Sequence, residues 1–131
     1  MEKGAIVLGA NNLYRDKLET TIKSICAHNQ NLKFYVFNDN IPKDWFYLMA
    51  KRLEKIDSEI VNIKVNSEIL QTFYTPRKYV KYMAYFRYFI PNFVIESRAL
   101  YLDCDIIVYK SLDDLFGVPF EDFYILVVAD S

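Results

Sequence analysis

The sequence predicts an α/β fold in which a largely parallel sheet has helices on both faces. Apolar runs of strand length alternate with segments whose apolar residues recur every three or four positions. The apolar runs are nearly continuous, which is typical of strands buried on both faces. The chain has 131 residues and is 53% apolar, which is enough for the core of one domain. No linker, repeat or low-complexity segment divides it.

The first half of the chain predicts two strand–helix units followed by a third strand. Residues 5–8 and 32–37 are the first two strands, and the second ends in the polar turn 38–40. The second helix begins at Pro42, because proline in a first helical turn loses no hydrogen bond. The third strand covers 60–65. The apolar faces of the two helices comprise Leu18, Ile22, Ile25 and Cys26 in the first, and Trp45, Leu48, Met49, Leu53 and Ile56 in the second.

The second half continues the alternation. Thr75 and Pro76 have the residue types of an N-cap and a first helical turn, so we expect a helix from there to Pro91. The remaining predicted elements are strands at 99–102, 106–109 and 124–128 and a short helical turn at 112–116. Consecutive parallel strands joined by right-handed crossovers account for this order.

Charge and glycine content exclude two large classes of ligand. The formal net charge is -1, from 16 basic and 17 acidic residues, so the chain lacks the basic surface that a nucleic-acid backbone requires. The three glycines, Gly4, Gly9 and Gly117, are too far apart for a phosphate-binding loop or a dinucleotide fingerprint. We therefore expect no nucleic-acid partner.

Histidine and cysteine content narrows the possibilities further. His28 is the single histidine and stands in a polar stretch, so we interpret it as an exposed, inert side chain. Cys26 and Cys104 are too few for a Cys/His zinc site and form no disulfide framework. The apolar run after the first residues is too short for a signal peptide or a membrane span. These features predict a reducing, cytoplasmic location and no transmembrane segment.

Polar residues follow the predicted strands where a ligand is expected. In open α/β sheets, ligands bind outside the carboxyl ends of the strands. Those ends are followed by residues 9–14, by Asp39, by residues 103–105 and by Asp130. Three of the four positions carry a carboxylate.

The most specific of these features is Asp103-Cys104-Asp105. Residues i and i+2 of an extended chain point to the same side, so two carboxylates meet at the end of an apolar strand. Two such anions repel each other unless a cation lies between them. Mn²⁺ or Mg²⁺ is the natural partner, because hard divalent ions prefer oxygen ligands. The alternative is a pair of solvated turn carboxylates.

Three segments together resemble glycosyltransferase family 8. Residues 98–108 with 111–116 resemble the metal-binding segment of the family, 6–14 its opening strand and uridine-binding loop, and 85–91 its helix with a substrate-contacting arginine. The resemblance covers essentially the whole chain. It implies a Rossmann-like fold of the GT-A type and a retaining enzyme that uses UDP-glucose or UDP-galactose with Mn²⁺.

The resemblance also implies roles for individual residues. Asp103 and Asp105 would bind the metal, with the backbone of Cys104 near the uridine or ribose. Residues implied in binding the nucleotide are Ala10, Asn11 and Tyr14, the last by stacking on uracil; Arg87 and Asp130 would hold the donor sugar and its diphosphate. Many family members have an aspartate where Asn11 stands, and an amide is a weaker, uncharged acceptor for the N3–H group of uracil.

Family members continue for well over a hundred further residues, which supply the acceptor site and a third metal ligand. We therefore expect residues 1–131 to form a single nucleotide-sugar-binding domain, the N-terminal part of a longer, here apparently truncated, glycosyltransferase domain. The catalytic residues are not identified. The implied reaction is metal-dependent transfer of a hexose, with retention, to a glycan, lipopolysaccharide or glycoprotein acceptor. Exposed aromatic residues on an incomplete domain also predict self-association.

Two other functions remain open. A non-catalytic interaction module with a degenerate glycosyltransferase fold is favoured by Asn11 and by the missing second half. A haloacid-dehalogenase-type phosphatase also places Asp-x-Asp after an apolar strand. That motif normally lies near the start of the chain and needs downstream residues for which little sequence remains after Asp105. Metal-linked UDP binding distinguishes the glycosyltransferase from both.

Overall fold

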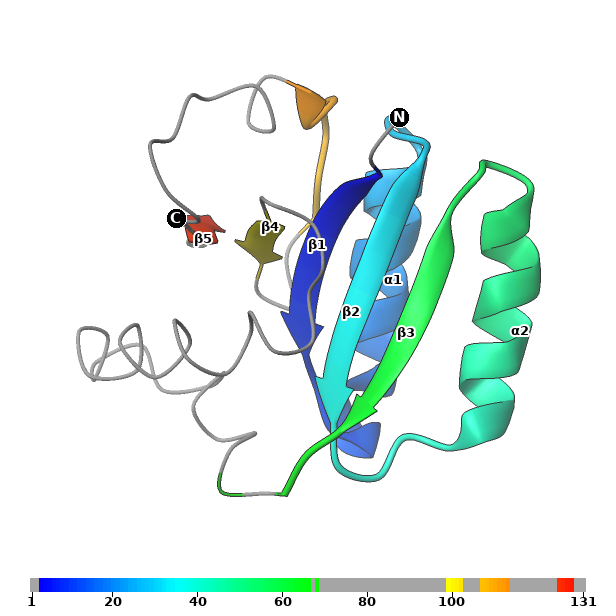
Figure 1. Cartoon of the computed structure of the whole chain (residues 1–131), viewed down its shortest axis with the longest axis vertical. Helices are drawn as coiled ribbons and strands as arrows, with labels where there is room; N and C mark the ends of the chain where they lie inside the picture. Colours follow the sequence, from blue (N-terminus) through cyan, green and yellow to red (C-terminus); the bar gives the residue numbers. More distant parts are fainter. Residues whose placement is uncertain (1–2, 67, 69–98, 103–106, 114–124, 129–131) are drawn as a thin grey trace.

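The structure is a computed structural model that describes residues 3–66, 68, 99–102, 107–113 and 125–128. Its described elements are β1 (Gly4–Gly9), the 3₁₀ turn η1 (Asn12–Tyr14), α1 (Arg15–Cys26), β2 (Leu32–Asn38), α2 (Lys43–Glu54), β3 (Glu59–Lys64), β4 (Ala99–Leu102) and β5 (Ile125–Val128). The five strands of this described part form one parallel sheet in the order β3-β2-β1-β4-β5 (Figure 1). The predicted parallel α/β architecture is confirmed.

The order of the strands reverses beside β1. β2 pairs with β1 along its whole length, from Gly4 opposite Leu32 to Gly9 opposite Phe37. β4 pairs with the other edge of β1, where Val7 lies opposite Tyr101. The carboxyl ends of β1 and β4 are therefore neighbours at the point where the chain changes direction. In sheets of this type, that point forms the ligand-binding crevice.

α1 and α2 pack on the same face of the sheet and share one apolar core with it. This core contains Leu18, Ile22 and Ile25 of α1, Trp45, Phe46, Met49 and Leu53 of α2, and Ile6, Leu8, Phe34, Val36, Leu100 and Leu102 of the strands. The alternate strand residues point to the opposite face and are buried as well, among them Val7, Tyr35 and Phe37. Both faces of the sheet are thus covered, as predicted for near-continuous apolar strands.

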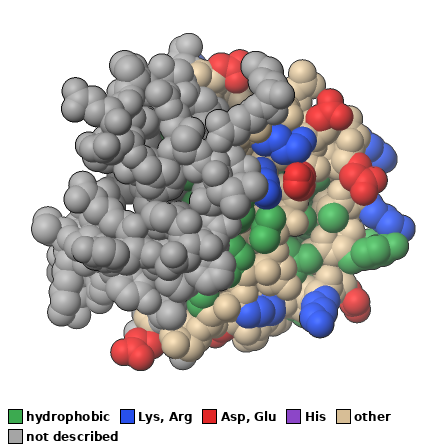
Figure 2. All heavy atoms as spheres, viewed as in Figure 1, with side chains coloured by type: hydrophobic (Ala, Val, Ile, Leu, Met, Phe, Trp, Pro, Cys, Tyr) green, Lys and Arg blue, Asp and Glu red, His purple; other side chains and the backbone are tan. Residues whose placement is uncertain are grey.

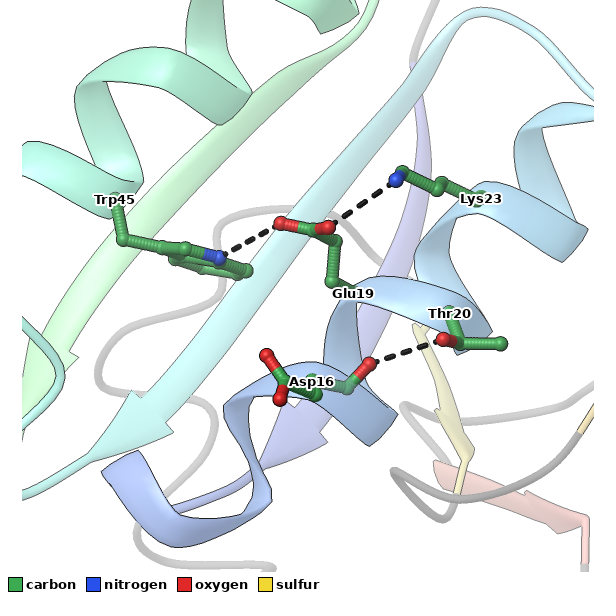
Figure 3. A network of polar contacts seen from close by, with 5 residues as sticks. All are labelled: Asp16, Glu19, Thr20, Lys23 and Trp45. Carbon is green, nitrogen blue, oxygen red and sulfur yellow. Dashed lines mark hydrogen bonds and ion pairs between the residues drawn. The ribbon is translucent and has the colours of Figure 1, made fainter.

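The two helices also meet through a polar contact at the margin of this core (Figure 3). The carboxylate of Glu19 accepts a hydrogen bond from the indole N–H of Trp45 at 3.1 Å. Its other oxygen forms an ion pair with Lys23, one turn further along α1, at 3.1 Å. Glu19 therefore links α1 to α2.

The two helices agree with the sequence prediction, apart from Leu48 and Ile56 of the second predicted helix. Pro42 precedes the first residue of α2, and its φ of -62° suits a helix start. Leu48 was predicted to face the core but is 56% exposed. The buried stripe of α2 runs through Trp45, Phe46, Met49 and Leu53, and Leu48 lies about 100° around the helix from Met49, on the side away from Phe46 and Leu53. The helix ends at Glu54, so Ile56 packs against the core from the turn that follows.

The predicted strand at 106–109 is wrong where the structure describes it, at 107–109. This segment lies against α1 and not in the sheet: Val108 N–H donates to Ser24 Oγ at 2.9 Å, and Leu112 N–H donates to Asn29 Oδ1 at 2.7 Å. Val108 and Leu112 pack on the core, while Tyr109 is 76% exposed. The segment is an apolar run in the sequence, but it packs against α1 and the turn that follows this helix.

Other predictions lie partly or wholly outside the described residues. These are the helix expected from Thr75 to Pro91 and most of the turn expected at 112–116. β5 at 125–128 confirms the last strand. In the part of the chain that is described, no helix is long and apolar enough to span a bilayer.

Candidate functional site

The turn after β1 is held in one conformation by its own polar groups. Asn11 has an extended backbone and caps η1, with Oδ1 accepting a hydrogen bond from the Tyr14 N–H at 3.2 Å. Ala10 is fully buried, and its N–H continues the ladder by donating to the Phe37 carbonyl at 3.0 Å. The turn therefore begins from a fixed point at the carboxyl end of β1.

A second contact fastens this turn to the loop after β2. The backbone N–H of Asn12 donates to Oδ1 of Asn40 at 2.8 Å. Asn12 is the first residue of η1, so the bond fixes the turn from outside as well as from within. Loops at two neighbouring strand ends are thus joined.

The loop after β2 has a buried asparagine at its base. Asn38 Nδ2 donates to Asn62 Oδ1 at 2.9 Å and to the Val36 carbonyl at 3.1 Å. Its Oδ1 accepts from the Ile41 N–H at 3.2 Å and from the ammonium group of Lys64. Because a buried amide with satisfied donors and acceptors has one favourable orientation, Asn38 holds the 38–41 loop on β3.

Tyr14 and its neighbour Leu13 are the exposed apolar side chains of the turn. Tyr14 is 39% exposed and Leu13 is 89% exposed. The ammonium group of Lys17 lies 5.4 Å from the centre of the Tyr14 ring, within the range of a cation–π contact. The turn therefore presents an accessible aromatic ring beside a cation.

Electrostatics at this edge centre on Lys64 and Asp39. Desolvation lowers the pKa of Lys64, and Lys43 lowers it further, while the nearby carboxylate of Asp39 acts to raise it. Oδ1 of Asp39 is buried and has no hydrogen-bond partner in the structure, which describes this whole loop. Elsewhere on the face shown in Figure 2, acidic and basic side chains are interspersed with apolar ones.

The structure brings together the three predicted site residues that it describes: Ala10, Asn11 and Tyr14 all belong to the β1 end and its turn. The other predicted site residues, Arg87, Asp103, Cys104, Asp105 and Asp130, lie outside the described residues. Among residues that are described, no three His, Cys, Asp or Glu side chains form a group able to hold a metal ion.

Two functional candidates were not found in the sequence. Asn40 stood within a predicted turn, but its partner Asn12 is 28 positions away. Lys64 lies within the predicted strand 60–65, with no role assigned to it. Neither carries a local signal, because each contact depends on the register of adjacent strands.

The fold and the polar turn define a class of protein: open, parallel α/β proteins whose ligand crevice lies at the strand-order reversal. Within that class, residues 5–131 match the family model described as Glycosyl transferase family 8. The chain belongs to this family.

Individual relatives agree with that assignment. The chain is 56% identical over 131 residues to "Glycosyltransferase GlyB" of Streptococcus pneumoniae serotype 4, covering all of the chain and 32% of GlyB. It superposes on the crystal structure of the S. pneumoniae glycosyltransferase GlyE with a TM-score of 0.74 and 36% identity, covering 91% of the chain and 28% of GlyE. The chain therefore spans about a third of the length of these relatives.

A more distant structure confirms the fold alone. The galactosyltransferase LgtC, solved in complex with donor and acceptor sugar analogs, superposes with a TM-score of 0.66 at 24% identity. The match covers 88% of this chain and 42% of LgtC. The fold is of the GT-A type, as the sequence predicted.

Proposed function

We propose that this chain is the donor-binding part of a retaining, metal-dependent glycosyltransferase that takes a hexose, glucose or galactose, from a UDP-sugar. One observation carries the proposal: the Asn11–Tyr14 turn lies at the carboxyl end of β1, beside the end of β4. β4 ends at Leu102, and the next residues in the sequence are Asp103-Cys104-Asp105. Membership of glycosyl transferase family 8 supports this interpretation.

In this proposal the nucleotide lies across the ends of β1 and β4. Tyr14 stacks on the base, Ala10 and Asn11 contact it, and the backbone at Cys104 lies near the ribose. Base–aromatic stacking tolerates any base, so identity has to be read by polar groups. Asn11 Oδ1 already accepts the Tyr14 N–H, which leaves it one remaining lone-pair direction for this purpose.

Asp103 and Asp105 are the proposed ligands of Mn²⁺ or Mg²⁺. Their carboxylate oxygens are the donor type that these hard cations prefer. A bound metal would offset the negative charge that develops on the departing diphosphate. Arg87 and Asp130 are proposed to hold the donor sugar and its diphosphate, where a fixed arginine adds positive charge beside the phosphates.

The proposed acceptor is a glycan, lipopolysaccharide or glycoprotein, bound largely by sequence that corresponds to the rest of the longer relatives. Residues 1–131 are thus proposed as one nucleotide-sugar-binding unit within such a domain. A reducing, cytoplasmic setting is part of the proposal. The half-buried free thiol of Cys26, whose pKa is raised by burial to about 11, is compatible with it.

Calorimetric titration with UDP, with and without Mn²⁺, tests this function. We expect binding that requires the metal, is abolished or strongly weakened by Asp103→Asn, and is much weaker for GDP. Circular dichroism establishes that the variant is folded. A folded wild-type chain that binds no nucleotide with Mn²⁺ would contradict the proposal and favour a non-catalytic interaction module.

A further inference from the structure

Asp39 carries an unexplained polar atom at the same edge of the sheet. Its carboxylate oxygen Oδ1 is buried and lacks a hydrogen-bond partner in the structure, which describes residues 3–66 without interruption. Buried carboxylate oxygens are nearly always paired, because an unpaired one loses its hydration without compensation. A group that binds from outside the chain is one way to satisfy it.

The position of Asp39 relative to the turn that carries Asn11 and Tyr14 is well defined by its neighbours. It follows Asn38, the last residue of β2, and precedes Asn40, which accepts the Asn12 N–H at 2.8 Å. The end of β2 is aligned with the end of β1 through the bond from Ala10 N–H to the Phe37 carbonyl. Asp39 is therefore placed on a loop that is fastened to the turn carrying Asn11 and Tyr14.

The charge on Asp39 has a partner nearby but not in contact. Asp39 interacts electrostatically with Lys64, whose ammonium group donates its hydrogen bonds to Asn38 and to the Ile41 carbonyl. Lys64 thus lies near the carboxylate of Asp39 without donating a hydrogen bond to its buried oxygen. The carboxylate is left as a strong acceptor.

We propose that Asp39 is a specificity-determining residue of the nucleotide site, whose carboxylate accepts a hydrogen bond from the N3–H of uracil. The inference rests on the proposed function. In the proposed function, the ribose lies near Cys104, after β4, and the base lies near Tyr14, after β1. Because β2 is on the other side of β1 from β4, the loop after β2 lies on the side of the base. Asp39 supplies the charged acceptor that Asn11 lacks.

Uracil and cytosine differ at the atom in question. N3 of uracil carries a hydrogen and donates, whereas N3 of cytosine carries a lone pair and accepts. A buried carboxylate pairs with the first and repels the second, so the wild-type site should prefer UDP over CDP. Loss of one charged hydrogen bond corresponds to about a tenfold or larger change in affinity.

The test compares Kd values for UDP and CDP, in the presence of Mn²⁺, between the wild-type chain and Asp39→Asn. The asparagine has the same shape but is uncharged, and its NH₂ group can donate to N3 of cytosine. We expect the preference for UDP over CDP to fall about tenfold or more. Asp57→Asn is the matched control, because Asp57 is exposed in the turn before β3, at the opposite edge of the sheet, and its variant should keep the wild-type preference.

A modified nucleotide gives a second measurement. UDP methylated at N3 lacks the donated hydrogen, so the wild-type chain should bind it at least tenfold more weakly than UDP, and Asp39→Asn should show a much smaller difference. An unchanged UDP/CDP ratio in a folded Asp39→Asn that binds UDP overturns this inference alone. Absence of UDP binding by the wild-type chain overturns the proposed function and this inference with it.

Discussion

The indole N–H of Trp45 donates a hydrogen bond to Glu19 across the boundary between α2 and α1, over 3.1 Å. Partial burial by itself raises the pKa of Glu19, but hydrogen bonds from Lys23 and Trp45 outweigh it, and the net pKa is lowered. The ionised carboxylate is therefore the form that stabilises the folded chain.

This relationship predicts a pH-dependent effect of Glu19→Gln. A carboxyl whose folded pKa lies below its unfolded value contributes stability above the unfolded pKa and loses it as pH falls through the folded pKa. The variant should therefore have a lower Tm than the wild type at pH 7, and the difference should shrink as the pH falls below 4.5, the ordinary value, and through the lowered pKa of the folded chain. Thermal unfolding by circular dichroism measures it. Glu54→Gln, at the exposed end of α2, is the control, and a Tm difference that stays undiminished from pH 7 to pH 3 would contradict the assignment.

Asn38→Ala should be strongly destabilising. The substitution leaves the Ile41 N–H and the side-chain oxygen Oδ1 of Asn62 without their partner, which costs about 2–3 kcal/mol of unfolding free energy. Urea unfolding followed by tryptophan fluorescence gives the value. Asn62→Ala removes one of these contacts and should cost less; equal losses for the two variants would argue against Asn38 as the centre of the network.

Asn40 should hold the Asn11–Tyr14 turn in position while contributing little to the free energy of unfolding. Asn40→Ala removes the acceptor of the Asn12 N–H, so we expect UDP to bind about fivefold more weakly. Asn40→Asp retains an oxygen at the same place and should restore most of the affinity. The positioning role would be refuted by alanine and aspartate variants with the same Kd, measured with Mn²⁺ by calorimetry.

Tyr14 should contribute to nucleotide affinity through its ring. Loss of base–aromatic stacking costs about 1–3 kcal/mol, so Tyr14→Ala should raise the Kd for UDP by about tenfold or more. Tyr14→Phe should bind nearly as well as the wild type, because the ring remains. Leu13→Ala, which changes an exposed neighbour, is the control. A phenylalanine variant as weak as the alanine variant would mean that the hydroxyl group is what matters.

The Cys26 thiol should be unreactive in the folded chain. Burial raises its pKa from 9.0 to about 11, so the thiolate at pH 8 is about 100-fold scarcer than for an ordinary thiol. In a Cys104→Ser variant, alkylation by iodoacetamide should be slower by about this factor in the folded than in the urea-unfolded chain. Its rate should rise about tenfold per pH unit through pH 9. A plateau near pH 9 would show an ordinary thiol.

Local patterns in the sequence were sufficient for most described elements. β1, β2 and β5 are continuous apolar runs, and the apolar spacing from Leu18 to Ile25 defines the buried face of α1. Sequence patterns failed where the packing partner of a segment lies far away along the chain. Residues 106–109 are an apolar run of strand length, but the side chains of Ser24 and Asn29 accept hydrogen bonds from the backbone N–H groups of Val108 and Leu112. The described part of this segment therefore packs against α1 and the turn after it.

The residues of the candidate site likewise separate into those that local sequence patterns predict and those that they do not. The turn of Ala10, Asn11 and Tyr14 is predicted from residue types and a family resemblance, and its internal contact joins Asn11 and Tyr14, which are three positions apart. Asn40 and Lys64 were not predicted, because their contacts with Asn12 and Asn38 span 28 and 26 positions.

The sequence by itself therefore determined the class of fold, the strands and helices within it, and the family to which the chain belongs, since these depend on periodicity and on short motifs. Only the tertiary structure decided the strand order and the face on which the helices pack. It also decided which loops meet at the carboxyl edge of the sheet. The physical reason is that the alignment of β1, β2 and β3 brings distant polar groups within hydrogen-bonding distance, and no local pattern records that alignment.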